Sequence, residues 1–173
     1  MWIDASESCF HEAMYDNFVV MEFHTKIILH PTDFSDNAAK ALHVASDLLN
    51  MPKARLVILH VIDIPENTEQ FSASELEKMK ADKTTEASEK MEQYLRNSFG
   101  GNSPIPVPEK IIRLHSTVYK DIIDYIIKID PYMLVVGQKG NAKNKHVMLG
   151  STTQHLLEKS TCPVLVVPSK MEE

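Results

Sequence analysis

The feature that most constrains the fold of this chain is a regular alternation of short apolar runs with segments of helical periodicity. Each apolar run has the length of a strand, and between the runs apolar residues recur at spacings of three and four. The strand candidates are residues 26–30, 54–62, 109–115, 132–137 and 163–168, and the helix candidates are residues 36–49, 73–97, 118–129 and 152–159. This βαβαβαβαβ order predicts an α/β fold: a single open parallel five-stranded sheet with helices on both faces.

Local signals support the helix candidates. Ser35 and Asp36 suit the N-terminal cap of the first helix, and Ser72 with Glu75 matches a capping box before the second. The third helix carries a stripe of isoleucines that we expect to face the sheet: Ile122, Ile123, Ile126 and Ile127.

Composition narrows the class of protein. The 173 residues are 43% hydrophobic, and no apolar run is long enough to span a bilayer, so a soluble single domain is expected. The net charge is −6, and no basic surface argues for a nucleic-acid partner. Cys9 and Cys162 lack the spacing of a disulfide framework or metal site, which fits the reducing cytoplasm. We expect Cys162 to be a buried free thiol.

The first 25 residues differ from the rest of the chain. They carry five acidic and no basic side chains, which leaves the remainder with a net charge of only −1. They lack the basic start and apolar centre of a signal peptide. We therefore divide the chain into an N-terminal extension of unknown role, residues 1–25, and one domain, residues 26–173.

Ligands of open parallel sheets bind beyond the carboxyl ends of the strands, where the strand order reverses. Three stretches follow strand candidates in this way, and they are residues 30–36, 60–65 and 137–152. The last stretch contains three of the chain's five glycines in the pattern G-x2-G-x9-G-S, between a strand and a helix.

This glycine pattern is suited to an anion. Gly137 and Gly140 would let backbone N–H groups approach it closely, while Gly150 and Ser151 would present the N-terminus of a helix. Positive charge is supplied locally by Lys139, Lys143, Lys145 and His146. The alternative is a plain glycine-bearing loop with a solvated basic face.

Four segments together resemble a known family. They are "KIILHPTDFSDNAAKAL", "LVILHVID", the glycine pattern and "STCPVLVVP". In this order they resemble the universal stress protein family, from residue 26 to about residue 169. The resemblance implies a Rossmann-like sheet of strand order 3-2-1-4-5, and the glycine pattern marks the ATP-binding branch of the family.

The resemblance also implies a nucleotide site, with Mg²⁺ accompanying the ATP. The nucleoside end would be lined by Pro31, Thr32, Asp33 and the backbone of Val61. The ribose and phosphates would be flanked by Val136, Gly137 and Gly140, with Lys139 at a position that is often basic. The phosphate tail would be held by Gly150, Ser151, Thr152 and Thr153.

Two stretches depart from the family pattern. "LHSTVYKDI" lacks the glycine that commonly precedes the third helix, which changes the loop beside the adenine end. "NAKNKHV", residues 141–147, is unusually rich in lysine and asparagine.

The sequence gives weaker support to other kinds of functional site. Asp33 and Asp36 resemble part of a phospho-accepting receiver domain, but "LHSTV" lacks the aspartate that such a domain needs after the third strand. His30, His60 and His115 end three strands expected to be neighbours, so a metal site is an alternative to packed, hydrogen-bonded histidines. No nucleophile–base–acid triad can be assembled from local spacing.

Three hypotheses for function follow. The first is an ATP-binding regulatory protein of the stress response. The second is a slow ATPase or autophosphorylating phosphotransferase, although Asp33 is the one candidate for a base in the three loops. The third is a nucleotide-free dimeric interaction module.

A homodimer through the last strand, residues 163–168, is expected because that strand would otherwise be an exposed sheet edge. Prolines at both ends would confine the pairing to the residues between them. The alternative is an edge covered by the N-terminal extension.

Overall fold

The computed structural model describes residues 25–65, 70–100, 107–140 and 148–170. Nearly all of the N-terminal extension therefore lies outside the described residues. The strands are β1 (Lys26–Pro31), β2 (Ala54–Asp63), β3 (Glu109–His115), β4 (Met133–Gly137) and β5 (Val164–Val167). The helices are α2 (Asp36–Asp47) with the short 3₁₀ turn η1 (Leu48–Asn50), α3 (Ala73–Phe99), α4 (Val118–Ile129) and α5 (Ser151–Lys159).

The five strands form one parallel sheet in the order β3-β2-β1-β4-β5, which confirms the predicted α/β fold and strand order. Strand β1 is central and pairs with β2 on one side and with β4 on the other. The chain thus adds β2 and β3 on one side of β1, and then β4 and β5 on the other side. This reversal leaves a crevice at the carboxyl ends of β1 and β4.

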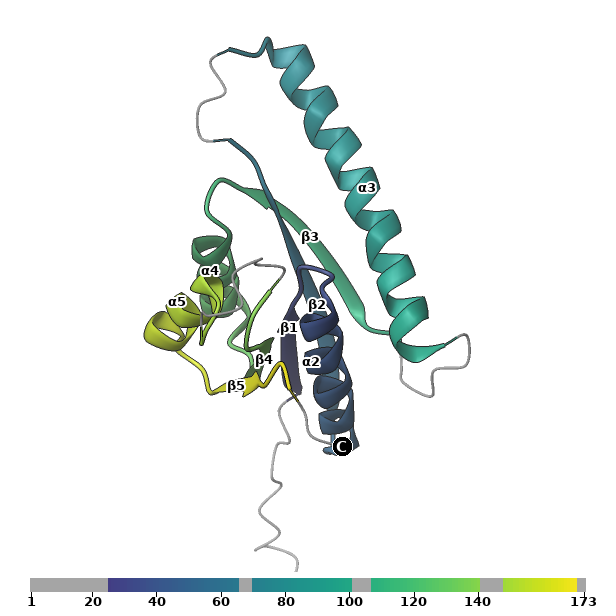
Figure 1. The fold of residues 1–173 in the computed structure, drawn as a ribbon, viewed down its shortest axis with the longest axis vertical. Coiled ribbons are helices and arrows are strands. Elements are labelled where there is room, and N and C mark those ends of the chain that lie inside the picture. The colour runs from purple at the N-terminus through teal and green to yellow at the C-terminus, as the bar shows by residue number, and fades with distance from the viewer. Residues whose placement is uncertain (1–24, 66–69, 101–106, 141–147, 171–173) are drawn as a thin grey trace, which may run out of the picture.

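Helices cover both faces of the sheet (Figure 1). Helices α2 and α3 pack on one face, over a core that includes Ile28 and Ile58. Helices α4 and α5 pack on the other face, over a core that includes Leu29 and Val57. Successive strand residues point to opposite faces, so each central strand is apolar nearly throughout and is buried on both sides.

The helix starts agree with the sequence signals. The Ser35 side chain caps α2 by accepting from the Ala38 N–H at 3.2 Å. Ser72 and Glu75 form the predicted capping box at the start of α3. In the described part of the chain, no helix is both long and apolar enough to cross a membrane.

Two burial predictions were wrong. Ile127 is 63% exposed, because the inward face of α4 contains Ile122, Tyr125 and Ile126 and the next residue turns about 100° away from it. Cys162 is a free thiol but only partly buried, with its Sγ 3.4 Å from the Ser160 hydroxyl in the turn before β5.

A partly buried ion pair anchors α4 to the sheet. Asp121 is 2% exposed and accepts two hydrogen bonds from the Arg113 guanidinium on β3, at 2.6 and 2.7 Å. The two parallel bonds satisfy a carboxylate that would be costly to bury alone. They fix the start of α4, and with it Val118 and Ile122, beside the crevice.

A buried histidine joins three elements at the centre of the fold. The His30 ring on β1 is fully buried; Nδ1 lies 3.0 Å from the Val135 carbonyl oxygen on β4, and Nε2 lies 3.1 Å from the Tyr94 hydroxyl on α3. A neutral ring satisfies both contacts when Nδ1–H donates to Val135 and Nε2 accepts from Tyr94. Burial lowers the pKa of His30 from its ordinary value to about 4.

This burial predicts a pH-dependent stability. The unfolded histidine takes up a proton near pH 6.5, whereas the folded one does so only near pH 4. Between these values the unfolded state binds more protons, so the free energy of unfolding falls as the pH drops, by up to about 1.4 kcal/mol per pH unit. Urea unfolding at pH 7 and pH 5 should show this loss, and His30→Gln should reduce it.

His60 contributes in the same direction, because burial also lowers its pKa, so part of the slope should remain in His30→Gln. An equal pH slope in the wild type and His30→Gln would contradict the role given to His30.

Candidate functional site

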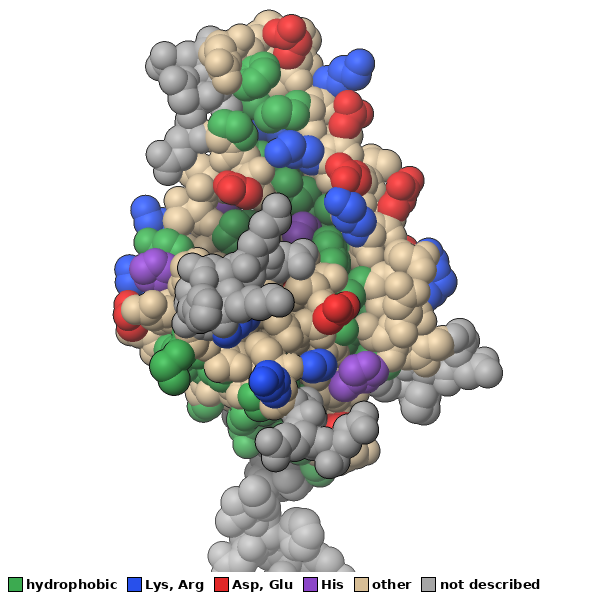
Figure 2. Space-filling view, in the orientation of Figure 1, with side chains coloured by type: hydrophobic (Ala, Val, Ile, Leu, Met, Phe, Trp, Pro, Cys, Tyr) green, Lys and Arg blue, Asp and Glu red, His purple; other side chains and the backbone are tan. Residues whose placement is uncertain are grey.

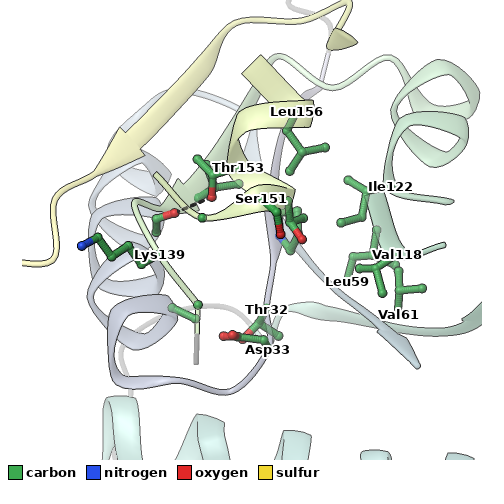
Figure 3. A pocket seen from close by; sticks show the side chains of 17 residues that line it. Thr32, Asp33, Leu59, Val61, Val118, Ile122, Lys139, Ser151, Thr153 and Leu156 are labelled. Atoms are coloured by element: carbon green, nitrogen blue, oxygen red, sulfur yellow. Dashed lines mark hydrogen bonds between the residues drawn. The ribbon is translucent and has the colours of Figure 1, made fainter. Parts of the chain in front are cut away.

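A cavity of about 260 Å³ opens at the carboxyl ends of β1, β2 and β4, bounded by the starts of α2, α4 and α5 (Figure 3). All twelve residues singled out in the sequence line it: Pro31, Thr32, Asp33, Val61, Val136, Gly137, Lys139, Gly140, Gly150, Ser151, Thr152 and Thr153. Three loops far apart in the sequence therefore meet around one space. That these residues contact a nucleotide stays a prediction.

Sequence reasoning missed five further lining residues, which are Ala38, Leu59, Val118, Ile122 and Leu156. Four of them form an apolar wall with Val61, opposite the polar groups of the cavity (Figure 3). Their apolar character was visible in the sequence, with Leu59 on a strand and the other three on helices. Their position facing the cavity depends on how α4 and α5 pack on the sheet.

The loop after β1 is organised by short-range hydrogen bonds. Thr32 Oγ1 accepts from the Phe34 N–H at 3.0 Å, and Asp33 Oδ1 accepts from the Ser35 N–H at 3.1 Å. Phe34 has a φ of 63°, in the left-handed region that non-glycine residues rarely adopt. Such strain is retained where the surroundings hold it, and it is frequent at functional sites.

Aromatic rings hold this strained turn in place. The Phe34 ring lies 4.2 Å from the His60 ring and 5.6 Å from the Tyr94 ring, measured between centroids. His60 Nδ1 lies 2.8 Å from the Thr32 carbonyl oxygen, to which it donates. Burial lowers the pKa of His60, so its ring is neutral at pH 7. The sequence indicated the histidine but not that it supports the loop carrying Asp33.

Close approach accounts for two of the three glycines, and none of the three has a positive φ. A Cβ on Gly137 would lie 2.9 Å from the Asn37 carbonyl oxygen, so its absence lets β4 end against the backbone of α2. A Cβ on Gly140 would collide with the Asp33 carboxylate. Gly150 meets only ordinary contacts, the nearest at 3.4 Å from Lys139 Cα. Gly137 thus has a role in packing, and its contact with an anion stays a prediction.

The N-terminus of α5 faces the cavity. Gly150 is its N-cap residue and, having no side chain, makes no side-chain capping bond. The first N–H groups of a helix have no partner within the helix and carry partial positive charge, which favours an anion. The Thr153 hydroxyl donates to the Gly137 carbonyl at 2.9 Å, so that proton is directed to β4 and not into the cavity.

Lys139 lines the cavity, but its side chain is directed away from it (Figure 3). The sequence predicted further positive charge from Lys143, Lys145 and His146. These three residues lie outside the described residues.

The histidines at the strand ends have separate partners. His30 bonds with Val135 and Tyr94, His60 with Thr32, and His115 Nδ1 accepts from the Thr117 N–H at 2.9 Å. Among the residues that the structure describes, no group of three or more His, Cys, Asp or Glu side chains is arranged to hold a metal ion.

Sequence comparison identifies the family. The profile of the universal stress protein family matches residues 24–168. The chain belongs to the universal stress protein family. Universal stress protein MJ0577 from Methanocaldococcus jannaschii is 28% identical over 159 residues, which cover 84% of this chain and 96% of the relative. Universal stress protein YxiE from Bacillus subtilis is 28% identical over 149 residues, covering 78% and 93%.

Solved structures of the family share this fold. The structure of MJ0577 aligns with this universal stress protein at a TM-score of 0.68 and 30% identity, covering 86% of this chain and 99% of the other. A family protein from Arabidopsis thaliana with AMP bound aligns at 0.56 and 14% identity, covering 84% and 92%. A universal stress protein in complex with cAMP aligns at 0.61 and 15% identity, covering 84% and 98%. At these identities, the AMP-bound and cAMP-bound structures show that this chain has the same fold.

The glycine contacts predict unequal effects of adding a methyl group. Gly137→Ala should lower the free energy of unfolding by about 1–3 kcal/mol, because backbone atoms of α2 must move to admit the Cβ. Gly150→Ala should cost less than about 1 kcal/mol, since its Cβ meets ordinary contacts and alanine is only a poorer N-cap. Urea unfolding of both variants measures the difference, and equal losses would count against the packing role of Gly137.

Proposed function

We propose that this universal stress protein binds an adenine nucleotide, with ATP and its Mg²⁺ as the physiological ligand, and acts as a cytoplasmic regulatory module of the stress response. The observation that carries the proposal is the two-ended cavity. An apolar wall lies at one end and the uncapped N-terminus of α5 at the other, in a space lined by all twelve residues predicted from the sequence.

The apolar end fits a nucleobase. Leu59, Val61, Val118 and Ile122 form an aliphatic surface against which a flat ring can pack, and burial of that surface favours binding. Asp33 lies between this wall and the glycine loop, so its carboxylate is placed to accept hydrogen bonds from ribose hydroxyls.

The other end fits phosphate. The N–H groups of the first turn of α5 and the Ser151 and Thr152 hydroxyls supply donors, and the helix dipole favours negative charge. Thr153 would contribute its backbone, because its hydroxyl already donates to Gly137.

Mg²⁺ fits as a partner of the nucleotide and not as a resident ion. Asp33 is the one carboxylate among the residues that line the cavity. A single carboxylate with phosphate oxygens is a usual environment for Mg²⁺, which keeps several of its waters. Two family members of the same fold were solved with AMP and with cAMP, which supports an adenine nucleotide here as well.

Slow ATP hydrolysis or autophosphorylation is the second candidate. The Ser151 and Thr152 hydroxyls lie at the phosphate end, within the set of lining residues. Hydrolysis also needs a group that orients water and donors that stabilise developing charge at the γ-phosphate. Asp33 is the one base among the lining residues, and the proposal assigns it to the nucleoside, so binding is favoured over turnover.

Nucleotide binding predicts a ligand-dependent melting temperature. Since a ligand of the folded state stabilises it by RT ln(1 + [L]/Kd), ATP–Mg²⁺ at 100 times its Kd should add about 2.7 kcal/mol. Asp33→Asn should weaken binding about tenfold or more, because a charged acceptor is lost. Asp36→Asn is the matched control, since Asp36 lies in the first turn of α2 but does not line the cavity.

A thermal-shift series with adenosine, AMP, ADP and ATP makes this measurement. The absence of a shift with every member, and of copurified nucleotide by mass spectrometry, would refute nucleotide binding and favour the nucleotide-free interaction module. Phosphate release at saturating ATP separates the first two functions: a rate that Asp33→Asn abolishes would establish the slow ATPase.

We also propose a homodimer through β5. Pro163 and Val167 accept hydrogen bonds from β4, and backbone groups alternate in direction along a strand, so Val164 and Val166 turn theirs toward the open edge. An antiparallel partner strand would pair with those groups.

Light scattering should accordingly give twice the chain mass of 19.6 kDa for the wild type and for Val166→Ala. Val166→Pro should give a monomer, because it removes an outward N–H without altering a bond to β4. A monomeric wild type would exclude the dimer.

A further inference from the structure

Gln138 uses every hydrogen-bonding group it has. Its backbone N–H donates to the Val167 carbonyl at 2.7 Å, and its backbone carbonyl accepts from the Gly150 N–H at 2.9 Å. Its side chain reaches two further segments: Nε2 donates to the Met148 carbonyl at 2.8 Å, and Oε1 accepts from the Ser169 N–H at 3.0 Å. One partly buried residue thereby contacts β5, the segment before α5, and the segment after β5.

The orientation of the amide follows from its partners. A carbonyl such as that of Met148 can only accept, and a backbone N–H such as that of Ser169 can only donate. The glutamine amide offers one donor and one acceptor in the required arrangement. A carboxylate would satisfy Ser169 alone, and an apolar side chain would satisfy neither.

These bonds fix the start of α5 relative to the glycine loop. Helix α5 has nine residues and no side-chain cap, and Met148, which precedes it, is 82% exposed, so apolar packing does little to hold this end. Gln138 bonds to Met148 and Gly150 from one side, and Thr153 Oγ1 bonds to Gly137 beside it. The start of α5 is thus tied to the end of β4 at three points.

The side-chain oxygen of Gln138 connects the same junction to the segment after β5. Ser169 donates to Gln138, and its carbonyl accepts from Lys40 Nζ of α2 at 2.5 Å. Ser169, in the segment after β5, is therefore connected to the cavity loop through Gln138 and to α2 through Lys40.

We propose that Gln138 is a positioning residue that sets the distance between the glycine loop and the N-terminus of α5, and thereby the preference of the cavity for phosphorylated ligands over the bare nucleoside. The inference rests on the proposed function for its ligand class. Gln138 itself does not line the cavity and acts through Met148 and Gly150.

The first test needs no ligand. Amide hydrogen exchange on the full chain should be about tenfold faster at Gly150 and Ser169 in Gln138→Leu than in the wild type. Gln138→Glu should accelerate Gly150 but leave Ser169 protected, because a carboxylate still accepts from Ser169. The Thr32 amide, which donates to Leu59 between β1 and β2, should be unchanged in both variants.

Gln93→Leu is the matched control. Gln93 is also a glutamine with two side-chain bonds, to Arg96 and Asn97 on the exposed face of α3, away from the cavity. It should leave exchange at all three amides as in the wild type.

The second test is calorimetric titration with ATP–Mg²⁺ and with adenosine. Gln138→Leu should weaken ATP binding about tenfold, which corresponds to about 1.4 kcal/mol, and leave adenosine binding unchanged. Gln93→Leu should change neither affinity.

The proposal would be overturned if Gln138→Leu weakened the binding of ATP and of adenosine equally, or if it accelerated exchange at Thr32 as much as at Gly150. Either result would mean that Gln138 stabilises the whole fold and does not position α5. Unchanged exchange at Gly150 in Gln138→Leu would overturn it as well. If the wild type binds neither ligand, the proposed function and the phosphate preference both fail. In that case, exchange still decides separately whether Gln138 holds α5.

Discussion

The pairing of β1 with both β2 and β4 is the arrangement on which the rest of this structure depends. It makes β1 the centre of the sheet and sends the connections that follow β1 and β4 to opposite faces, so the space beyond their carboxyl ends is not covered by a crossing segment. His30 reinforces the same junction, because its fully buried ring joins β1 to the carbonyl of Val135 on β4 and to Tyr94 on α3. The cavity exists where it does because this junction is both tightly held and open at one end.

Close approach of neighbouring atoms explains two of the three glycines in the loop better than backbone flexibility. Gly137 lets β4 end against α2, and Gly140 leaves room for the carboxylate of Asp33. The wall of the cavity and its polar residues are thereby brought within reach of one small ligand.

The polar residues of the site are held by neighbours that do not line it. Phe34 is strained at a φ of 63°, and the rings of His60 and Tyr94 support that turn while Asp33 is presented to the cavity. Burial lowers the pKa of both His30 and His60, so these supports are neutral at pH 7 and bring no positive charge close to Asp33. Gln138 has the corresponding role for the start of α5.

The sequence by itself determined the elements and the parallel sheet, because strand and helix periodicity and helix caps are local signals. The twelve residues around the cavity came from its resemblance to the universal stress protein family. Only the tertiary structure decided which apolar side chains complete the cavity, as with Leu59 and Ile122, and which fail to be buried, as with Ile127. It also decided that Lys139 points away and that Gln138 bonds to residues 10 and 31 positions distant. These outcomes depend on the distances between elements that are remote in the chain, and no periodicity within one element encodes them.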